Sequence, residues 1–76
     1  MKAFVLIHIR GSEIREVVRQ LRQIEHVQEA TMTFGPYDAV AVLEADDINH
    51  LGRIIARSVR PIPGMLETLT CLATDA

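Results

Sequence analysis

The chain has 76 residues, of which 49% are apolar, 24% charged and 4% aromatic, with a formal net charge of -2 at pH 7. This length fits a single domain, residues 1–76, and excludes a two-domain enzyme, while the apolar fraction excludes a disordered chain. The acidic balance gives no electrostatic support to direct DNA binding, which relies on a basic face.

The first predicted element is a strand over Ala3–Ile9, a short and nearly continuous apolar run. Such a run suits a central strand that is covered on both faces. It is far shorter than the roughly 20 residues that cross a bilayer, and it does not resemble a secretory signal. Cys71 is the only cysteine, so an internal disulfide is excluded. We therefore expect a cytoplasmic protein with no membrane segment.

The next predicted element is an amphipathic helix that begins after Gly11, with Ser12 as its expected N-cap. Its apolar residues follow the spacing of a single helix face: Ile14, Val17, Val18, Leu21 and Ile24. Charged and amide side chains occupy the other face, so this helix is expected to pack with one side on the core.

A second strand is predicted over residues 27–34, because polar and apolar residues alternate there. Alternation places Val27, Glu29 and Thr31 on one face and Ala30 on the other. The polar content indicates a strand at the edge of a sheet.

Gly35-Pro36-Tyr37-Asp38 is typical of a turn, since glycine tolerates unusual dihedrals, proline fixes its own φ and aspartate caps locally. The apolar run Ala39–Leu43 that follows predicts a central strand next to the first one. The short connection predicts a hairpin between the second and third strands.

A second helix is predicted after Asp46, the expected N-cap, and it ends at Pro61–Gly64. Its expected buried stripe comprises Ile48, Leu51, Ile54, Ile55 and Val59. A fourth strand, Met65–Ala73, completes the chain and places Thr68 and Thr70 on one face.

The predicted element order is βαββαβ, two similar halves joined by a hairpin. Right-handed crossovers lead from this order to an α+β, ferredoxin-like sandwich, a four-stranded antiparallel sheet with two helices on one face. The first and third strands lie in the middle of that sheet. They are also the two most apolar runs, so pattern and topology agree.

The sheet face without helices is predicted to be apolar. Phe4, Leu6 and His8 share this face of the first strand, and Val40 and Val42 share it on the third. A large exposed apolar patch marks an interaction surface, and so small a domain gains needed stability from association. We expect two copies to pair sheet against sheet. The alternative is that another domain of a larger chain covers the face.

The residues offer little for catalysis. His8, His26 and His50 show no metal-binding spacing, and glycine-rich nucleotide-binding loops are missing from the sequence. We therefore expect no metal, no cofactor and no enzymatic activity. The alternative is a small dimeric α+β barrel enzyme, of the monooxygenase or isomerase type, that uses His8 in the cleft between sheets.

Four segments together resemble the effector-binding (RAM) domain of the Lrp/AsnC family over Ala3 to Ala73, nearly the whole chain. They are the opening strand Ala3-Phe4-Val5-Leu6-Ile7, the turn Gly35-Pro36-Tyr37-Asp38 with the apolar strand after it, the helix start Glu44-Ala45-Asp46-Asp47, and Ile62-Pro63-Gly64 before Thr68-Leu69-Thr70. Each segment alone is a weak signal, whereas the turn combined with the later Ile-Pro-Gly is moderately specific.

The resemblance implies a homodimer, assembled further into octamers or decamers, that binds a small amino acid between dimers. It nominates Gly35, Tyr37 and Asp38 as ligand-binding residues, with Thr68 and Thr70 as partners on the last strand. A zwitterion needs N–H donors for its carboxylate and an acceptor for its ammonium. Pro36 departs from this requirement because it removes one N–H from the turn.

Regulators of this family carry a helix-turn-helix domain before the effector-binding domain, whereas this sequence starts at the first strand. The resemblance therefore implies a stand-alone sensing domain that does not bind DNA directly. It would act either by shifting its own assembly state or by mixing with full-length Lrp/AsnC regulators. A third reading with the same fold is the ACT-type amino-acid module, whose subunits pair side by side rather than face to face.

Overall fold

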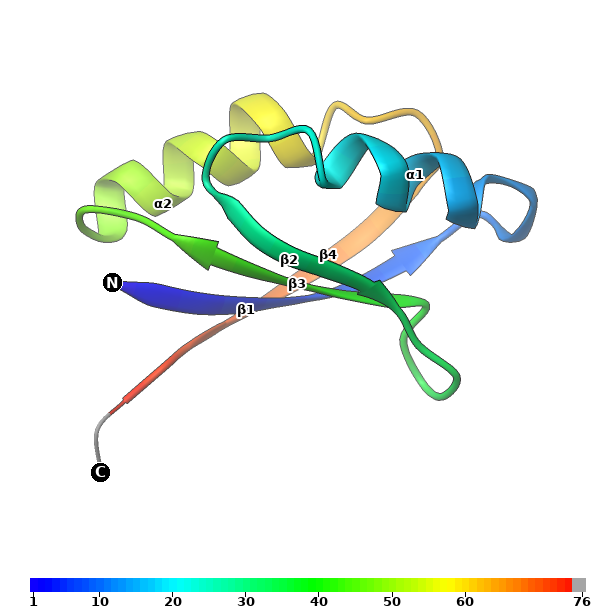
Figure 1. The fold of residues 1–76 in the computed structure, drawn as a ribbon, viewed down its shortest axis with the longest axis horizontal. Helices are drawn as coiled ribbons and strands as arrows, with labels where there is room; N and C mark the ends of the chain where they lie inside the picture. The colour runs from blue at the N-terminus through cyan, green and yellow to red at the C-terminus, as the bar shows by residue number, and fades with distance from the viewer. Residues whose placement is uncertain (75–76) are drawn as a thin grey trace.

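The computed structural model describes residues 1–74 and contains a four-stranded antiparallel sheet with the order β2-β3-β1-β4. Its strands are β1 (Lys2–Ile9), β2 (Val27–Met32), β3 (Ala39–Glu44) and β4 (Met65–Leu72), and its helices are α1 (Ile14–Leu21) and α2 (Ile48–Ile54). Both helices lie on the same side of the sheet (Figure 1). The ferredoxin-like prediction is confirmed, including the central places of β1 and β3.

The core lies between the helix layer and one face of the sheet. Along β1 buried and half-buried residues alternate, so that Val5 and Ile7 are completely buried while Leu6 is only partly covered. The same alternation occurs along β3, where Ala41 and Leu43 are buried. Val17, Val18 and Leu21 of α1 pack onto this face, as the predicted helix stripe required. The other two residues of that stripe, Ile14 and Ile24, are partly buried against the same core, and Ile24 lies beyond the end of α1.

The opposite face of the sheet, which we call the open face, has no helix over it. It carries the half-buried residues Phe4, Leu6, Val40 and Val42, as the alternation in the sequence predicted. Leu69 of β4 pairs with Leu6 and extends this apolar surface toward the sheet edge, where its side chain is exposed. In one copy of the chain, therefore, apolar side chains in the middle of the sheet contact water.

Both expected helix caps differ from the structure. Gly11–Glu13 forms a short 3-10 turn before α1, and Ser12 does not cap the helix. At α2 the cap is Asp47 rather than Asp46, because the Asp47 Oδ1 atom accepts a hydrogen bond of 2.8 Å from the backbone N–H of His50. The helix therefore begins one residue later than predicted.

This shift changes which side chains of the second helix are buried. Ile48, predicted to face the core, is 57% exposed, whereas Leu51 and Ile54 are buried. A π-helical extension, Ile55–Val59, continues α2 and buries both of its terminal residues. Ile54, Ile55 and Val59 are all buried, as the regular helical spacing predicted.

Irregular pairing at both sheet edges changes which side chains share a face. The register of β2 shifts between Val27 and Glu29, so Val27 is buried with Ala30 on the helix side rather than lying opposite to it. A similar shift at the start of β4 pairs Met65 with Ile9. Strict alternation was therefore wrong for Val27 and for Met65, which packs against the core.

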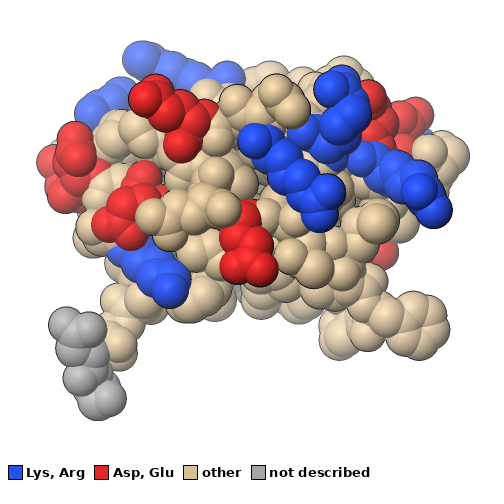
Figure 2. All heavy atoms as spheres, viewed as in Figure 1, with Lys and Arg blue, Asp and Glu red and all other residues tan. Residues whose placement is uncertain are grey.

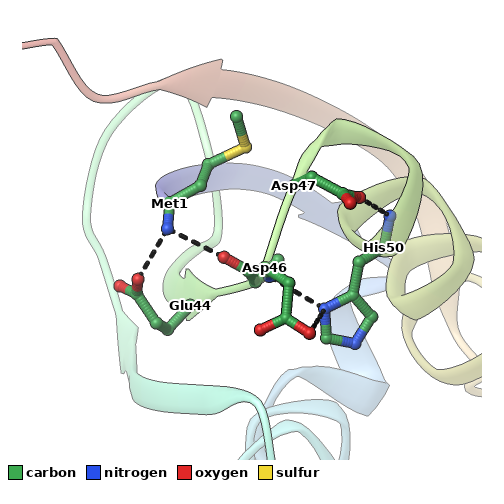
Figure 3. A network of polar contacts seen from close by, with 6 residues as sticks. Met1, Glu44, Asp46, Asp47 and His50 are labelled. Atoms are coloured by element: carbon green, nitrogen blue, oxygen red, sulfur yellow. Dashed lines mark hydrogen bonds and ion pairs between the residues drawn. The ribbon is translucent and has the colours of Figure 1, made fainter.

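Polar contacts join the start of β1 to the start of α2 (Figure 3). The amino group of Met1 lies 2.8 Å from Glu44 Oε1 and donates to the carbonyl oxygen of Ala45 at 2.8 Å. His50 Nδ1 accepts a hydrogen bond of 2.9 Å from the backbone N–H of Asp46. These contacts hold the β3–α2 connection against β1.

On α1, Arg19 Nε donates to both carboxylate oxygens of Glu16 at 2.8 Å, which lowers the pKa of Glu16. This pair lies on the solvent side of the helix and far from the open face. Among the helices of the described part of the chain, none is both long and apolar enough to cross a membrane.

Candidate functional site

The turn between β2 and β3 is closed by main-chain and side-chain hydrogen bonds. The N–H of Thr33 donates to the carbonyl of Asp38 at 3.0 Å, and the Thr33 hydroxyl donates to the carbonyl of Tyr37 at 2.6 Å. These bonds close a loop, Phe34–Tyr37, in which Gly35 does not adopt a positive φ, since Gly64 is the one glycine with a positive φ in the part of the chain that the structure describes. The predicted hairpin turn is thus present and stiffened by a threonine.

Asp38 attaches this turn to the end of β1. Its backbone N–H donates to the carbonyl of Ile7 at 2.8 Å, and its Oδ2 atom accepts from the backbone N–H of Ile9 at 2.8 Å. The carboxylate therefore takes the place of a main-chain carbonyl where the β1–β3 ladder ends. One oxygen of Asp38 is structural.

Replacing Asp38 by alanine is expected to lower the free energy of unfolding by about 1–3 kcal/mol, since the N–H of the buried Ile9 loses its acceptor. Glu67→Ala is the matched control, because that exposed carboxylate accepts no backbone hydrogen bond within residues 1–74. Urea denaturation of both variants measures the difference. Equal stability of the two variants would contradict a structural role for Asp38.

His8 lies next to the turn, between two carboxylates. Its Nδ1 atom is 4.0 Å from Asp38 Oδ2, and its Nε2 atom is 3.7 Å from Glu67 Oε1. The His8 and Tyr37 rings contact each other, with centroids 4.6 Å apart. We call His8, Tyr37, Asp38 and Glu67 the turn cluster. It combines an imidazole, a phenol and two carboxylates at the edge of the open face.

The two threonines nominated from the resemblance lie on the other side of the sheet. Thr68 pairs with Ile7 and Thr70 with Val5, and directly paired residues point to the same face. Because Ile7 and Val5 face the helices, Thr68 and Thr70 do too, although β4 is an edge strand and Thr70 is exposed. Within one copy, the sheet separates these threonines from Tyr37 and Asp38.

Two shallow hollows lie along the edge strands. One, of about 300 Å³, is lined by Arg60, Met65, Leu66, Glu67 and Thr68 at the start of β4. The other, of about 370 Å³, follows β2 from Val27 to Thr31 and includes Arg22, whose Nε atom donates to the carbonyl of Ala30 at 2.9 Å. Of the nominated ligand residues, only Thr68 lines a hollow, and His8 lines neither.

Sequence reasoning missed Glu67 and Arg60 as neighbours of the nominated residues. Glu67 contacts His8 because β4 pairs with β1 in a register that places the two opposite each other. No local pattern in β4 reveals this register, which is regular up to His8 and shifts only beyond it, between His8 and Ile9. Within residues 1–74, no group of three or more histidine, cysteine, aspartate or glutamate side chains is arranged so that it could hold a metal ion.

A comparison with known protein families matches residues 2–76 to the Lrp/AsnC ligand binding domain. Among curated sequences, the chain is 30% identical over 60 residues to an HTH-type transcriptional regulator of Methanocaldococcus jannaschii, covering 79% of this chain and 40% of that protein. It is 31% identical over 74 residues to an uncharacterized HTH-type transcriptional regulator of Pyrococcus horikoshii, covering 93% of this chain and 49% of that protein. The chain thus spans about half the length of these relatives or less.

Solved structures share the fold. A protein from Thermus thermophilus superposes with a TM-score of 0.92 at 31% identity, covering 99% of this chain and 94% of that chain. AsnC of E. coli gives a TM-score of 0.92 at 18% identity, over 99% of this chain and 51% of that chain. A Neisseria meningitidis transcriptional regulator, solved as a complex with L-methionine, gives a TM-score of 0.85 at 17% identity, over 97% of this chain and 50% of that chain.

Proposed function

The chain belongs to the Lrp/AsnC ligand-binding domain family, and from this premise we propose that it senses an amino acid or related small metabolite and self-assembles in doing so. The observation that carries the proposal is the turn cluster. It combines a stiff hairpin turn with a phenol, an imidazole and two carboxylates at the rim of an apolar, uncovered sheet face.

Assembly begins with a dimer formed through the open face. Phe4, Leu6, Val40 and Val42 leave water when a second copy lies against them, at about 25 cal/mol for each Å² of apolar surface buried. His8 lies at the rim of this interface, beside Asp38 and Glu67. In the dimer, the sheet of the second copy covers the apolar open face, as a further layer of helices would do in a larger domain.

The ligand pocket forms between subunits. Tyr37 and Asp38 lie beside His8 on the open-face side of the sheet, whereas Thr68 and Thr70 lie on the helix side. These four residues can therefore meet around one ligand only when they come from different copies. Asp38 Oδ2 is engaged by the N–H of Ile9, which leaves Asp38 Oδ1 to accept from a ligand ammonium. Gly35 offers the main-chain N–H for the carboxylate, since Pro36 has none.

The alternative enzyme reading has no support. It requires a deep pocket at His8, and neither hollow reaches that residue. The relatives are named as transcriptional regulators, in keeping with a domain that regulates rather than catalyses. We propose that the domain acts in the cytoplasm, on or within regulators of its own family, and that it has no catalytic activity.

Native mass spectrometry with each of the twenty amino acids tests the sensing proposal. At a ligand concentration of 100 times Kd, binding only to the assembled form stabilises that form by about 2.7 kcal/mol, so the population of the larger assembly should rise. The expected result is a mass increase for at least one amino acid together with this shift. Intact assemblies that bind none of the twenty would contradict sensing of amino acids.

Tyr37→Ala is expected to weaken the binding of that amino acid at least tenfold, because the variant loses the phenol of the turn cluster. Ile48→Ala is the matched control, since Ile48 is an exposed apolar residue on the helix layer. If both variants bind the ligand as tightly as the wild type does, the turn is not the ligand site.

A further inference from the structure

Phe34 is the most exposed large apolar residue described, with its side chain fully accessible to solvent (107% of the reference value). It lies at the tip of the β2–β3 hairpin, in the loop that the Thr33 hydrogen bonds close. Tyr37, the other aromatic residue of this loop, contacts His8. The two rings therefore differ: one is held against the sheet and the other points into solvent.

The hairpin tip projects on the open-face side of the sheet. In Figure 1 the β2–β3 loop extends beyond the strands, away from both helices, and the end of β4 extends to the same side at the other end of the molecule. In Figure 2 charged side chains gather over the helix layer and the flanks, while the projection at the lower right shows none. Residues 33–37 contain no charged residue.

We propose that Phe34 is an anchor that docks on a second copy of this chain across the open face. The inference rests on the proposed dimer and names a residue of the interface that lies outside the sheet. Any molecule that covers the open face comes within reach of a loop projecting on that side. In a two-fold dimer each copy then inserts one Phe34 at the margin of the other.

The dimensions of the molecule favour a second copy as the occupant. The Cα atoms extend 35 Å along the longest axis and 17 Å along the shortest, and these two axes contain the sheet in the view of Figure 1. The area that these two extents span is of the same order as the roughly 800 Å² of surface that each partner buries in a stable protein–protein interface. One copy of this domain therefore matches the open face in size.

The composition of the loop argues against a lipid surface. Loops and helices that insert aromatic residues into membranes carry lysine or arginine beside them, which bind anionic headgroups. The nearest charged residue to Phe34 within the hairpin is Asp38, an acid. A fully exposed aromatic side chain in an uncharged loop is instead typical of a residue buried in a protein–protein interface, where aromatic residues dominate the binding energy.

Tryptophan fluorescence tests this proposal, because the natural chain contains no tryptophan. The Phe34→Trp variant is expected to show a blue-shifted emission that follows the monomer–dimer equilibrium as concentration rises. A reference monomer is supplied by combining it with Leu6→Glu on the open face, and that double variant should emit as an exposed indole. Ile48→Trp, on the helix layer, should emit alike in monomer and dimer.

The companion variant Phe34→Ala is expected to raise the dimer Kd about a hundredfold or more, since the contact occurs twice in a two-fold dimer. Its unfolding at low concentration should match the wild type, because Phe34 contributes nothing to the core of one copy. The Kd is measured by sedimentation of a concentration series, with Ile48→Ala as the control.

The outcomes separate this inference from the proposed function. A dimeric wild type whose Phe34→Trp emission stays that of an exposed indole, or shifts only in assemblies larger than a dimer, overturns the anchor and leaves the sheet-face dimer standing. A wild type that is monomeric at all concentrations overturns both. An emission shift that follows dimer formation, together with the weaker dimer of Phe34→Ala, supports both.

Discussion

Replacing Leu6 by glutamate is expected to convert the assembled protein into a folded monomer at micromolar concentration. Leu6 lies in the middle of the open face, paired with Val40 on one side and Leu69 on the other. In a face-to-face dimer the new carboxylate would be buried without a partner in both copies, which costs several kcal/mol for each ion. We expect the dimer Kd to rise at least a thousandfold, as measured by sedimentation.

The fold of one copy should tolerate this change, because Leu6 is only half-buried and faces away from the helices. Ile48→Glu is the control, since it places the same charge on an exposed apolar site of the helix layer and should leave the assembly intact. A Leu6→Glu protein that sediments like the wild type would show that the open face is not the interface.

Gly64→Ala is expected to lower the free energy of unfolding by about 2–5 kcal/mol, from the cost of a left-handed conformation and of overpacking. Gly64 has φ +95°, and an added Cβ atom would lie 2.6 Å from Cβ of Glu13 and 3.3 Å from Cγ2 of Val17. The carbonyl of Gly64 also accepts from the N–H of Arg10 at 2.9 Å. The strain in the Gly64→Ala variant would therefore act on the hydrogen bond that joins the segment after β1 to the segment before β4. Urea denaturation measures the loss.

Gly52→Ala adds the same methyl group where, apart from its chain neighbours and the backbone of its own helix, no atom lies within 4 Å. Because Gly52 lies inside α2, alanine should raise the free energy of unfolding by about 0.5–1 kcal/mol. The two substitutions thus have opposite expected signs for an identical chemical change. A Gly64→Ala protein as stable as the wild type would mean that the connection before β4 adopts another conformation in solution.

The fold could be predicted from the sequence because the clearest apolar runs of the sequence form the most buried strands. The runs Ala3–Ile9 and Ala39–Leu43 are nearly all apolar, and they became the two central strands. The polar second strand became an edge. Handedness rules then leave one topology for this order of elements, so the fold followed from a few long-range features and did not depend on exact boundaries.

The predictions that were wrong concern helix caps and strand registers, where several local arrangements of the chain have nearly equal energy. Asp46 and Asp47 are adjacent and both suit an N-cap, and the one that caps is decided by the packing of the connection between β3 and α2. The register shifts next to Val27 in β2 and next to Met65 in β4 likewise depend on tertiary packing. Periodicity alone could not place them, and on the second helix it wrongly assigned Ile48, which is exposed, to the buried stripe.

The candidate site was only partly predictable. The turn and its Tyr37 and Asp38 follow from the sequence, since glycine, proline and aspartate there specify a hairpin. That Asp38 also binds the main chain of Ile9, and that Glu67 reaches His8, depends on contacts between residues far apart in the sequence. The placement of Thr68 and Thr70 on the other side of the sheet depends on strand register and makes assembly part of the proposed site.

Sedimentation of the unmodified protein over a concentration series tests most directly whether two copies cover each other's uncovered sheet. We expect a particle of at least twice the 8.5 kDa chain mass at micromolar concentration, and its dissociation by the Leu6→Glu substitution. A stable particle of 8.5 kDa across the whole series would contradict it.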